Sequence, residues 1–181
     1  MRIRAATDHD AQAIGHVHVE AWRFAYRDIL PEAYLASLSP EERAGQWRSL
    51  LKDPGSSTRF VLVVVNERDD VVGFAAAGPQ RSDEPEYQGE LYALYVLPLH
   101  QRRGLGRALV RAVAHRLLAG GMSSMSLWVL ESNASARRFY ERLGGSMARD
   151  RPIAIGGVTF TEVAYGWPRL GVLLNRSAED T

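Results

Sequence analysis

The chain has 181 residues, a usual length for one domain, and its formal net charge of +1 gives no overall field that would attract nucleic acid or an anionic membrane. Hydrophobic residues make up 46% and charged residues 24% of the sequence, and no apolar run approaches the roughly 18 residues that cross a bilayer. The absence of cysteine excludes disulfides, thiolate metal sites and a cysteine nucleophile. Because the first residues turn polar where a signal peptide needs an apolar stretch, we expect a cytoplasmic protein without nucleic-acid or membrane partners.

The first third of the chain is mainly helical by pattern. A short strand at 2–6 precedes a helix in which apolar side chains recur every three or four residues as far as about Asp28. A second helix is predicted at 31–38. A third begins at Ser39-Pro40, where an N-cap residue is followed by proline at the first helical position. The turn-rich segment 53–57 ends this helical part.

The rest of the chain alternates between strands and helices. Two short apolar runs joined by a turn predict an antiparallel hairpin, and glycine pairs end both of the later helices. In chain order the predicted elements are strands at 60–65, 71–77 and 90–97, a helix from 105 to about 119, a strand at 125–130, a helix from about 134 to 143, and strands at 147–155 and 158–166. This order predicts an α/β (α+β) fold with a mixed sheet, in one domain of residues 1–168 followed by a tail at 169–181.

A glycine-rich turn, residues 101–107, lies between a predicted strand and a predicted helix. Its two glycines let backbone N–H groups approach a ligand closely, and a helix start carries partial positive charge, so this turn suits an anion such as a diphosphate. The alternative is a plain turn whose arginines lie in solvent. A dinucleotide fingerprint is incomplete, because Leu109 stands where a third small residue is needed, and no Gly-Lys-Ser or Gly-Lys-Thr phosphate loop exists.

Two linked motifs resemble those of the GNAT superfamily of N-acetyltransferases. The acetyl-coenzyme A loop of that family reads Gln or Arg, two residues, Gly, one residue, and Gly or Ala, which Gln101, Gly104 and Gly106 match. Some thirty residues further on, the segment 133–144 resembles the family's helix with Asn, Ala, Tyr and Gly. The resemblance implies an acetyl-CoA-dependent N-acetyltransferase with a mostly antiparallel central sheet flanked by helices. Homodimers are frequent in the family, so a homodimer is a further expectation.

The resemblance also implies which residues bind the cofactor, acetyl-CoA (coenzyme A). The main chain of one strand would contact the pantetheine arm, and the glycine turn would hold the diphosphate. The residues expected to bind the cofactor are Leu94, Tyr95, Val96, Gln101, Arg102, Arg103, Gly104, Leu105, Gly106, Arg107 and Asn133. No metal is expected, because His16 and His18 are two residues apart on a predicted helix and therefore face different directions.

Moving an acetyl group from a thioester to an amine requires a neutral amine, a donor to the oxyanion and a proton for the departing thiolate. By the resemblance, a backbone N–H near Val96 is the oxyanion donor and Tyr140 is the general acid. Glu90, at the start of the same strand as Val96, is the candidate general base. Two alternatives stay open: Tyr140 as a core residue, and Glu90 as a strand-end acid that pairs with an arginine or orders the loop at 81–88.

Candidate acceptor-binding residues lie on the first helix. Glu20, Trp22 and Tyr26 would offer an acid and an aromatic wall to a cationic amine, although the spacing of the two rings also fits packing of the helix on the sheet. We expect a small-molecule primary amine, polyamine-like in character, as acceptor, with direct transfer in a ternary complex. A protein or peptide N-acetyltransferase and a non-catalytic acyl-CoA sensor are the alternatives. Relatives that act on protein N-termini often have glutamate where this chain has Trp128, which disfavours that subclass.

Overall fold

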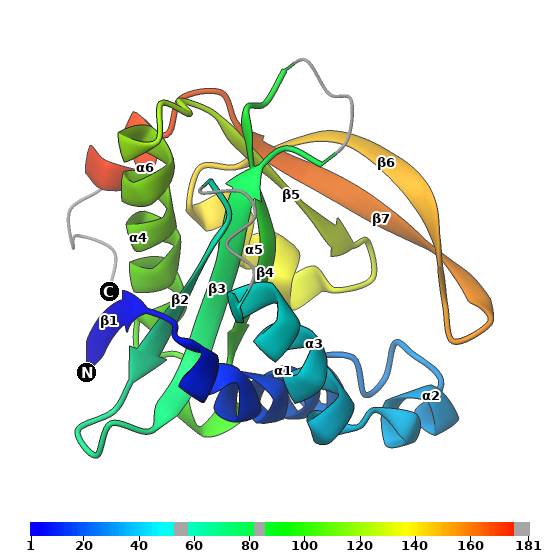
Figure 1. The fold of residues 1–181 in the computed structure, drawn as a ribbon. Helices are drawn as coiled ribbons and strands as arrows, with labels where there is room; N and C mark the ends of the chain where they lie inside the picture. The colour runs from blue at the N-terminus through cyan, green and yellow to red at the C-terminus, as the bar shows by residue number, and fades with distance from the viewer. Residues whose placement is uncertain (53–57, 82–85, 176–181) are drawn as a thin grey trace.

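The computed structural model describes residues 1–52, 58–81 and 86–175 of the chain (Figure 1). The predicted segment 53–57, part of the loop at 81–88 and the end of the expected tail lie outside these ranges. The elements are β1 (Arg2–Ala5), η1 (Asp8–Asp10), α1 (Ala11–Ala25), α2 (Glu32–Ser37), α3 (Pro40–Lys52), β2 (Phe60–Val65), β3 (Val71–Pro79), β4 (Gly89–Val96), η2 (Pro98–His100), α4 (Leu105–Ala119), β5 (Met125–Leu130), α5 (Ala134–Arg142), β6 (Ser146–Ile155), β7 (Val158–Trp167) and α6 (Gly171–Asn175). The predicted strands and helices agree with these bounds to within a few residues, whereas η1, η2 and α6 were not predicted.

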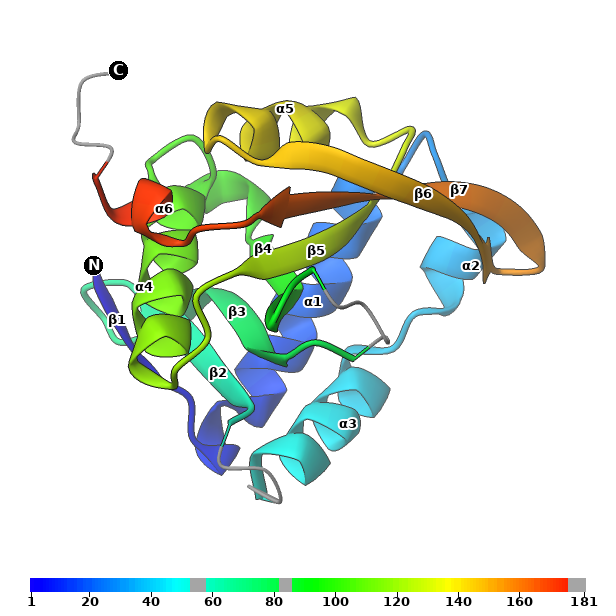
Figure 2. The same ribbon diagram turned by 90° about the horizontal axis from the view of Figure 1, so that it is seen from above.

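Seven strands form one sheet in the order β1-β2-β3-β4-β5-β7-β6, seen from above in Figure 2. The central β4–β5 pair is parallel, and the other neighbouring pairs among the described strands are antiparallel. The parallel pair arises because β4 is followed by a helical crossover, α4, before β5. The prediction of a mixed, mostly antiparallel sheet flanked by helices is therefore confirmed.

Helices cover both faces of the sheet, and alternate residues of its strands pack against them. On β2, Leu62 and Val64 face α4, whereas Val63 and Val65 face α1. The helix α5 contributes to the α4 side of the core, and α3 packs against α1 (Figure 2). The period of two along each strand thus separates two apolar cores with the sheet between them.

The two central strands diverge soon after they start. Within the described strands, the register pairs between β4 and β5 are Gly89 with Met125 and Glu90 with Ser126. Beyond these pairs β4 continues along β3, and β5 continues along β7. The diverging strands leave main-chain N–H and C=O groups of β4 without a β5 partner, and they open the middle of the sheet for a ligand.

The folded part of the chain continues past the expected boundary at residue 168. Leu170 and Leu173 are buried in the α4 side of the core, and the backbone N–H of Leu170 donates to the carbonyl of Ser123 at 2.9 Å. The helix α6 therefore packs against α4 as part of the domain. The sequence pattern missed this helix because it is five residues long, too short to show a helical period.

On the other face, a partly buried histidine, His18, connects α1, α3 and the sheet. His18 stacks on Tyr95 with ring centroids 5.0 Å apart, and the indole Nε1 of Trp47 donates to its Nδ1 at 3.1 Å. Burial, together with the positive charge of Arg43, lowers the pKa of His18 to about 4. The imidazole is therefore neutral in the folded protein at neutral pH.

This histidine is expected to make the stability depend on pH. Because its pKa is about 4 in the folded chain against 6.5 in a free side chain, the unfolded state takes up a proton first as the pH falls. The contribution of His18 to the free energy of unfolding is therefore fully present above pH 6.5. About 3 kcal/mol of it is lost as the pH falls to 4. Urea unfolding at several pH values should show this loss in the wild type and in the exposed-site control His16→Gln, but a much smaller one in His18→Gln. Equal pH dependence of the unfolding free energy in all three proteins would contradict its assignment to His18.

Candidate active site

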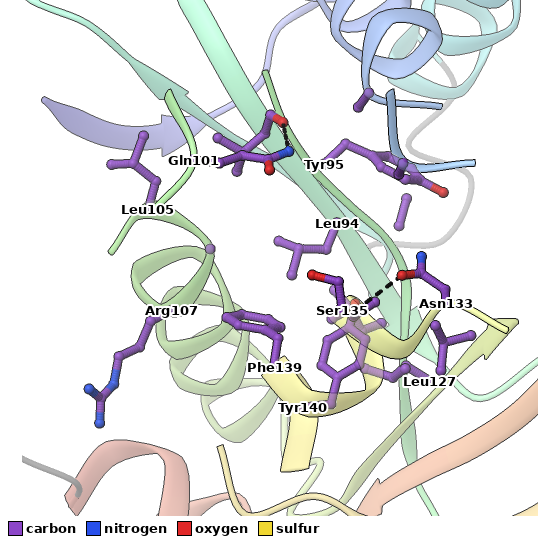
Figure 3. A pocket seen from close by; sticks show the side chains of 18 of the residues that line it. Leu94, Tyr95, Gln101, Leu105, Arg107, Leu127, Asn133, Ser135, Phe139 and Tyr140 are labelled. Atoms are coloured by element: carbon purple, nitrogen blue, oxygen red, sulfur yellow. Dashed lines mark hydrogen bonds between the residues drawn. The ribbon is translucent and has the colours of Figure 1, made fainter. Parts of the chain in front are cut away.

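A cavity of about 810 Å³ lies where β4 and β5 diverge. Its walls come from the end of α1, from β4, from the turn before α4 and the start of that helix, from β5, and from α5 (Figure 3). The lining residues are Ala21, Phe24, Ala25, Tyr26, Leu91, Tyr92, Ala93, Leu94, Tyr95, Val96, Gln101, Arg102, Gly104, Leu105, Gly106, Arg107, Leu127, Trp128, Val129, Asn133, Ser135, Ala136, Phe139, Tyr140 and Arg142. Ten of the eleven residues expected to bind the cofactor are among them; the exposed Arg103 is not.

The glycine turn ends at the N-terminus of α4 and faces this cavity. Gly104 has φ of +77°, a left-handed conformation that glycine adopts without strain, and it is followed directly by the first helical residue, Leu105. The first N–H groups of an α-helix have no partner within the helix, and Gly104 has no side chain that could cap those of α4. The partial positive charge of this 15-residue helix and the adjacent Arg102 and Arg107 favour an anion here.

The second glycine of the turn allows α4 and α5 to approach each other. A Cβ atom on Gly106 would lie 3.2 Å from the ring of Phe139, so a larger side chain would push the two helices apart. On the other side of the turn, the Nε2 of Gln101 donates to the carbonyl of Val96 at 3.0 Å. The turn is thereby held against both the end of β4 and the helix that carries Tyr140.

Tyr140 lies on α5 with its side chain against the cavity. The helix begins after Asn133, whose side-chain oxygen accepts from the N–H of Ala136 at 3.1 Å, and the phenol is reached by solvent only slightly, at 9% exposure. Burial, and to a smaller degree the nearby Tyr26, raises the pKa of Tyr140 well above its usual 10. The phenol therefore keeps its proton at neutral pH and is suited to donate it.

Glu90 occupies a different position from Tyr140. It is buried, it is not among the cavity-lining residues, and its carboxylate accepts from Arg81. The backbone N–H of Arg81 donates to Oε2 at 3.1 Å and its Nε donates to Oε1 at 3.2 Å. These contacts favour the alternative role named for Glu90, in which it pairs with an arginine and orders the start of the loop at 81–88.

The three candidate acceptor residues of α1 are separated in the structure. Tyr26 lines the cavity, where burial raises the pKa of its hydroxyl. Trp22 packs edge-to-face on Tyr26, with ring centroids 5.0 Å apart, and does not line the cavity. Glu20 pairs with Arg23 at 3.2 Å, also away from the cavity. The arrangement favours packing as the role of Trp22 and keeps Tyr26 next to the site.

Four aromatic residues of the cavity lining were not assigned to the site from the sequence: Phe24, Tyr92, Trp128 and Phe139. Tyr92 on β4 and Trp128 on β5 both line the cavity. Trp128 lies between Leu127 and Val129, which face the α4 side of the core, so the alternation along β5 places the indole on the opposite face. This alternation was readable from the sequence, whereas the divergence of β5 from β4, which exposes the ring, was not.

Comparison with known proteins agrees with this geometry. Residues 18–145 match the Acetyltransferase (GNAT) family, so the chain belongs to that family. It is 41% identical over 177 residues to the uncharacterized N-acetyltransferase YuaI of Bacillus subtilis, covering 96% of this chain and 98% of that protein. It is also 36% identical over 106 residues to a mycothiol acetyltransferase of Rhodococcus opacus, covering 58% of this chain but only 32% of that longer protein.

The fold is shared with solved acetyltransferases. The PaiA N-acetyltransferase of Thermoplasma acidophilum, solved in complex with coenzyme A, superposes with a TM-score of 0.72 at 20% identity, over 90% of this chain and 96% of that one. The family and the enzyme class predicted from the sequence, an acetyl-CoA-dependent N-acetyltransferase, are confirmed. In the part of the chain that the structure describes, no helix has the length and apolar character to cross a bilayer.

Proposed function

We propose that this enzyme acetylates the primary amine of a small molecule by direct transfer, with the acetyl donor and the acceptor bound together. The observation that carries the proposal is that a single cavity joins the glycine turn at the start of α4 to Tyr140 and continues to Tyr26 and Trp128. One part of this cavity suits the donor, and the aromatic part suits a second molecule of modest size. A covalent acyl-cysteine route is excluded because the sequence contains no cysteine.

The residues around the turn fit coenzyme A. Unpartnered N–H groups at the start of α4, with Arg102 and Arg107 beside them, would hold the diphosphate. The edge of β4 at Leu94–Val96, which has no β5 partner in the described register, would hydrogen-bond to the amide groups of the pantetheine arm. When bound there, acetyl-CoA supplies an activated acetyl group as a thioester.

Tyr140 on α5 and the backbone at the end of β4 are assigned different steps of the transfer. We assign to Tyr140 the donation of its phenolic proton to the departing sulfur, since its raised pKa keeps it protonated. The backbone N–H near Val96 is assigned to the developing negative charge on the carbonyl oxygen. The neutral amine attacks the carbonyl carbon, and the carbon–sulfur bond breaks as the tetrahedral adduct collapses to the amide. The nitrogen gives up one proton to solvent, the thiolate takes the proton of Tyr140, and Tyr140 regains a proton from solvent.

An acceptor screen tests the proposal. Release of free thiol from acetyl-CoA should be measured with amines, amino acids, aminoglycosides and peptides. Transfer to a small amine with intersecting initial-rate lines supports the proposal, because both substrates are then bound before the first product leaves. Parallel lines, or transfer to peptides alone, would contradict it. Coenzyme A binding without thiol release for any acceptor would instead support an acyl-CoA sensor.

The role of Glu90 is decided by a separate measurement. Because its carboxylate is buried and hydrogen-bonded to Arg81, we expect Glu90→Gln to weaken that contact, lower the melting temperature and leave the acidic limb of the kcat/KM profile in place. The acidic limb of the kcat/KM profile then reports ionisation of the acceptor amine itself. If the variant loses the acidic limb, Glu90 accepts the proton, and the assignment of a base role to this glutamate holds.

A further inference from the structure

Three guanidinium groups lie over Tyr92 and Trp128, two aromatic side chains of the cavity lining that we call its acceptor part. The guanidinium of Arg151, from β6, lies over the Trp128 ring at 3.8 Å from its centroid, and that of Arg81 lies over the Tyr92 ring at 4.3 Å. Arg149 also lies over the Trp128 ring, at 5.4 Å. Because both rings are cavity residues, positive charge adjoins the acceptor part of the site.

Arg151 and Arg81 each form an ion pair with a buried carboxylate. The Nε of Arg151 donates to Oε1 of Glu162 at 2.6 Å, and Arg81 donates to Glu90 as described above. Glu162 and Glu90 are 7% and 3% exposed, whereas the side chains of Arg151 and Arg81 are 46% and 53% exposed. The acids are therefore buried and the arginines partly exposed. Neither arginine is itself among the cavity-lining residues; each adjoins the cavity through the ring that it covers.

Arg151 keeps hydrogen-bonding capacity for a ligand. Among the hydrogen bonds of the described residues, its side chain uses Nε alone, so the N–H groups of Nη1 and Nη2 have no partner there. A guanidinium that is fixed by stacking on a ring and by a carboxylate at Nε presents the remaining N–H groups in a planar fork. That fork matches the two oxygens of a carboxylate. The pair adjoins the cavity through Trp128, whose ring Arg151 covers and which lines the cavity.

We propose that the acceptor is a primary amine that also carries a carboxylate, as an amino acid does, and that Arg151 binds this carboxylate while Arg81 adds attraction. The proposal rests on the proposed function and narrows its acceptor. It departs from the polyamine-like acceptor expected from the sequence, because the acids near the site, Glu162 and Glu90, are already paired with arginines. A second ammonium group would meet these guanidinium groups, and the two buried acids among the described residues beside them are already paired.

Matched acceptors test this proposal. The probes are L-leucine with isoamylamine, L-phenylalanine with phenethylamine, and L-lysine with cadaverine, in which each amine lacks the carboxylate of its amino acid. A charge-assisted, two-point contact predicts that kcat/KM favours the amino acid by about 10-fold or more in at least one pair. Equal or higher kcat/KM for all three carboxylate-free amines would overturn the inference and leave the proposed function intact. Transfer to none of the six, with transfer to a carboxylate-free small amine of the wider screen, would also overturn the inference. No transfer to any small amine of that screen, with coenzyme A binding unchanged, would contradict the proposed function itself.

Variants test whether Arg151 causes the preference for the amino acid over its matched amine. The double variant Arg151→Gln/Glu162→Gln removes the cation together with its buried acid, so no unpaired carboxylate is left in the core. We expect its preference for the amino acid to disappear while the melting-temperature rise with coenzyme A stays at the wild-type value. Arg151→Lys, which keeps the charge but not the planar fork, should lose part of the preference. The control Arg116→Gln removes a guanidinium from the ring of Phe60, outside the cavity, and should keep the preference in full. An unchanged preference in the double variant or in Arg151→Lys would overturn the proposal.

Discussion

Replacing Gly104 with aspartate is expected to abolish the binding of coenzyme A. The new carboxylate would lie at the N-terminus of α4, where the diphosphate is proposed to bind, and the two negative charges would repel each other. For the wild type, coenzyme A at 100 times its Kd stabilises the fold by about 2.7 kcal/mol, which raises the melting temperature of a chain of this size by about 5–10 °C. Thermal unfolding of Gly104→Asp with coenzyme A should show no rise.

The matched control is Gly104→Asn, which has the same shape without the charge. At φ of +77° both residues are strained, but asparagine and aspartate tolerate the left-handed region better than other side chains do. A Cβ atom at this position would meet no other atom within 4 Å, so neither variant creates a clash there. We expect Gly104→Asn to keep most of the temperature rise. If both variants lose it, backbone geometry is responsible; if both keep it, the diphosphate is not bound at this turn.

Features of the fold that depend on nearby residues were predictable from the sequence. The bounds of α4 follow from an apolar stripe and from glycine pairs that stop the helix, and the hairpin of β6 and β7 follows from the turn at 156–157. The glycine turn is partly local: Gly104 is favoured by its own φ of +77°, whereas Gly106 is favoured by its approach to Phe139 on α5. Arg103 is the exception: Arg102 has φ of +60°, so the chain turns there and leaves Arg103 exposed, outside the cavity lining.

Features that depend on long-range pairing were not predictable. The strand containing Glu90 was recognised, but its partner Arg81 reaches it across the end of a loop, and nothing local distinguishes this pair from a free catalytic acid. The contact of Arg151 with Trp128 depends on the order in which β5, β7 and β6 lie in the sheet. The cavity itself exists because β4 and β5 diverge after two register pairs, which is a property of the whole sheet.

Replacing Tyr140 with phenylalanine is expected to lower kcat by about 100-fold to 10,000-fold, the usual contribution of a general acid, without weakening coenzyme A binding. The variant keeps the ring, which packs against Phe139 and Trp167 with centroids 5.2 and 6.3 Å away, so the fold should be retained. The fall in kcat then comes from the loss of one proton donor. Steady-state kinetics and calorimetric titration with coenzyme A measure the two effects separately.

A neighbouring tyrosine provides the control for a merely structural effect. Tyr165 accepts a hydrogen bond from the Nε of Arg137 at 3.1 Å and donates one to Glu141, but it does not line the cavity. Tyr165→Phe should therefore lose stability and keep kcat, the reverse of Tyr140→Phe. Because its pKa lies well above 10, Tyr140 should stay protonated throughout the range from pH 7 to pH 10, so wild-type kcat should show no alkaline decline there from loss of this proton. A kcat in Tyr140→Phe equal to that of the wild type would remove Tyr140 from the mechanism, and the proton would then have to reach the sulfur from water in the cavity.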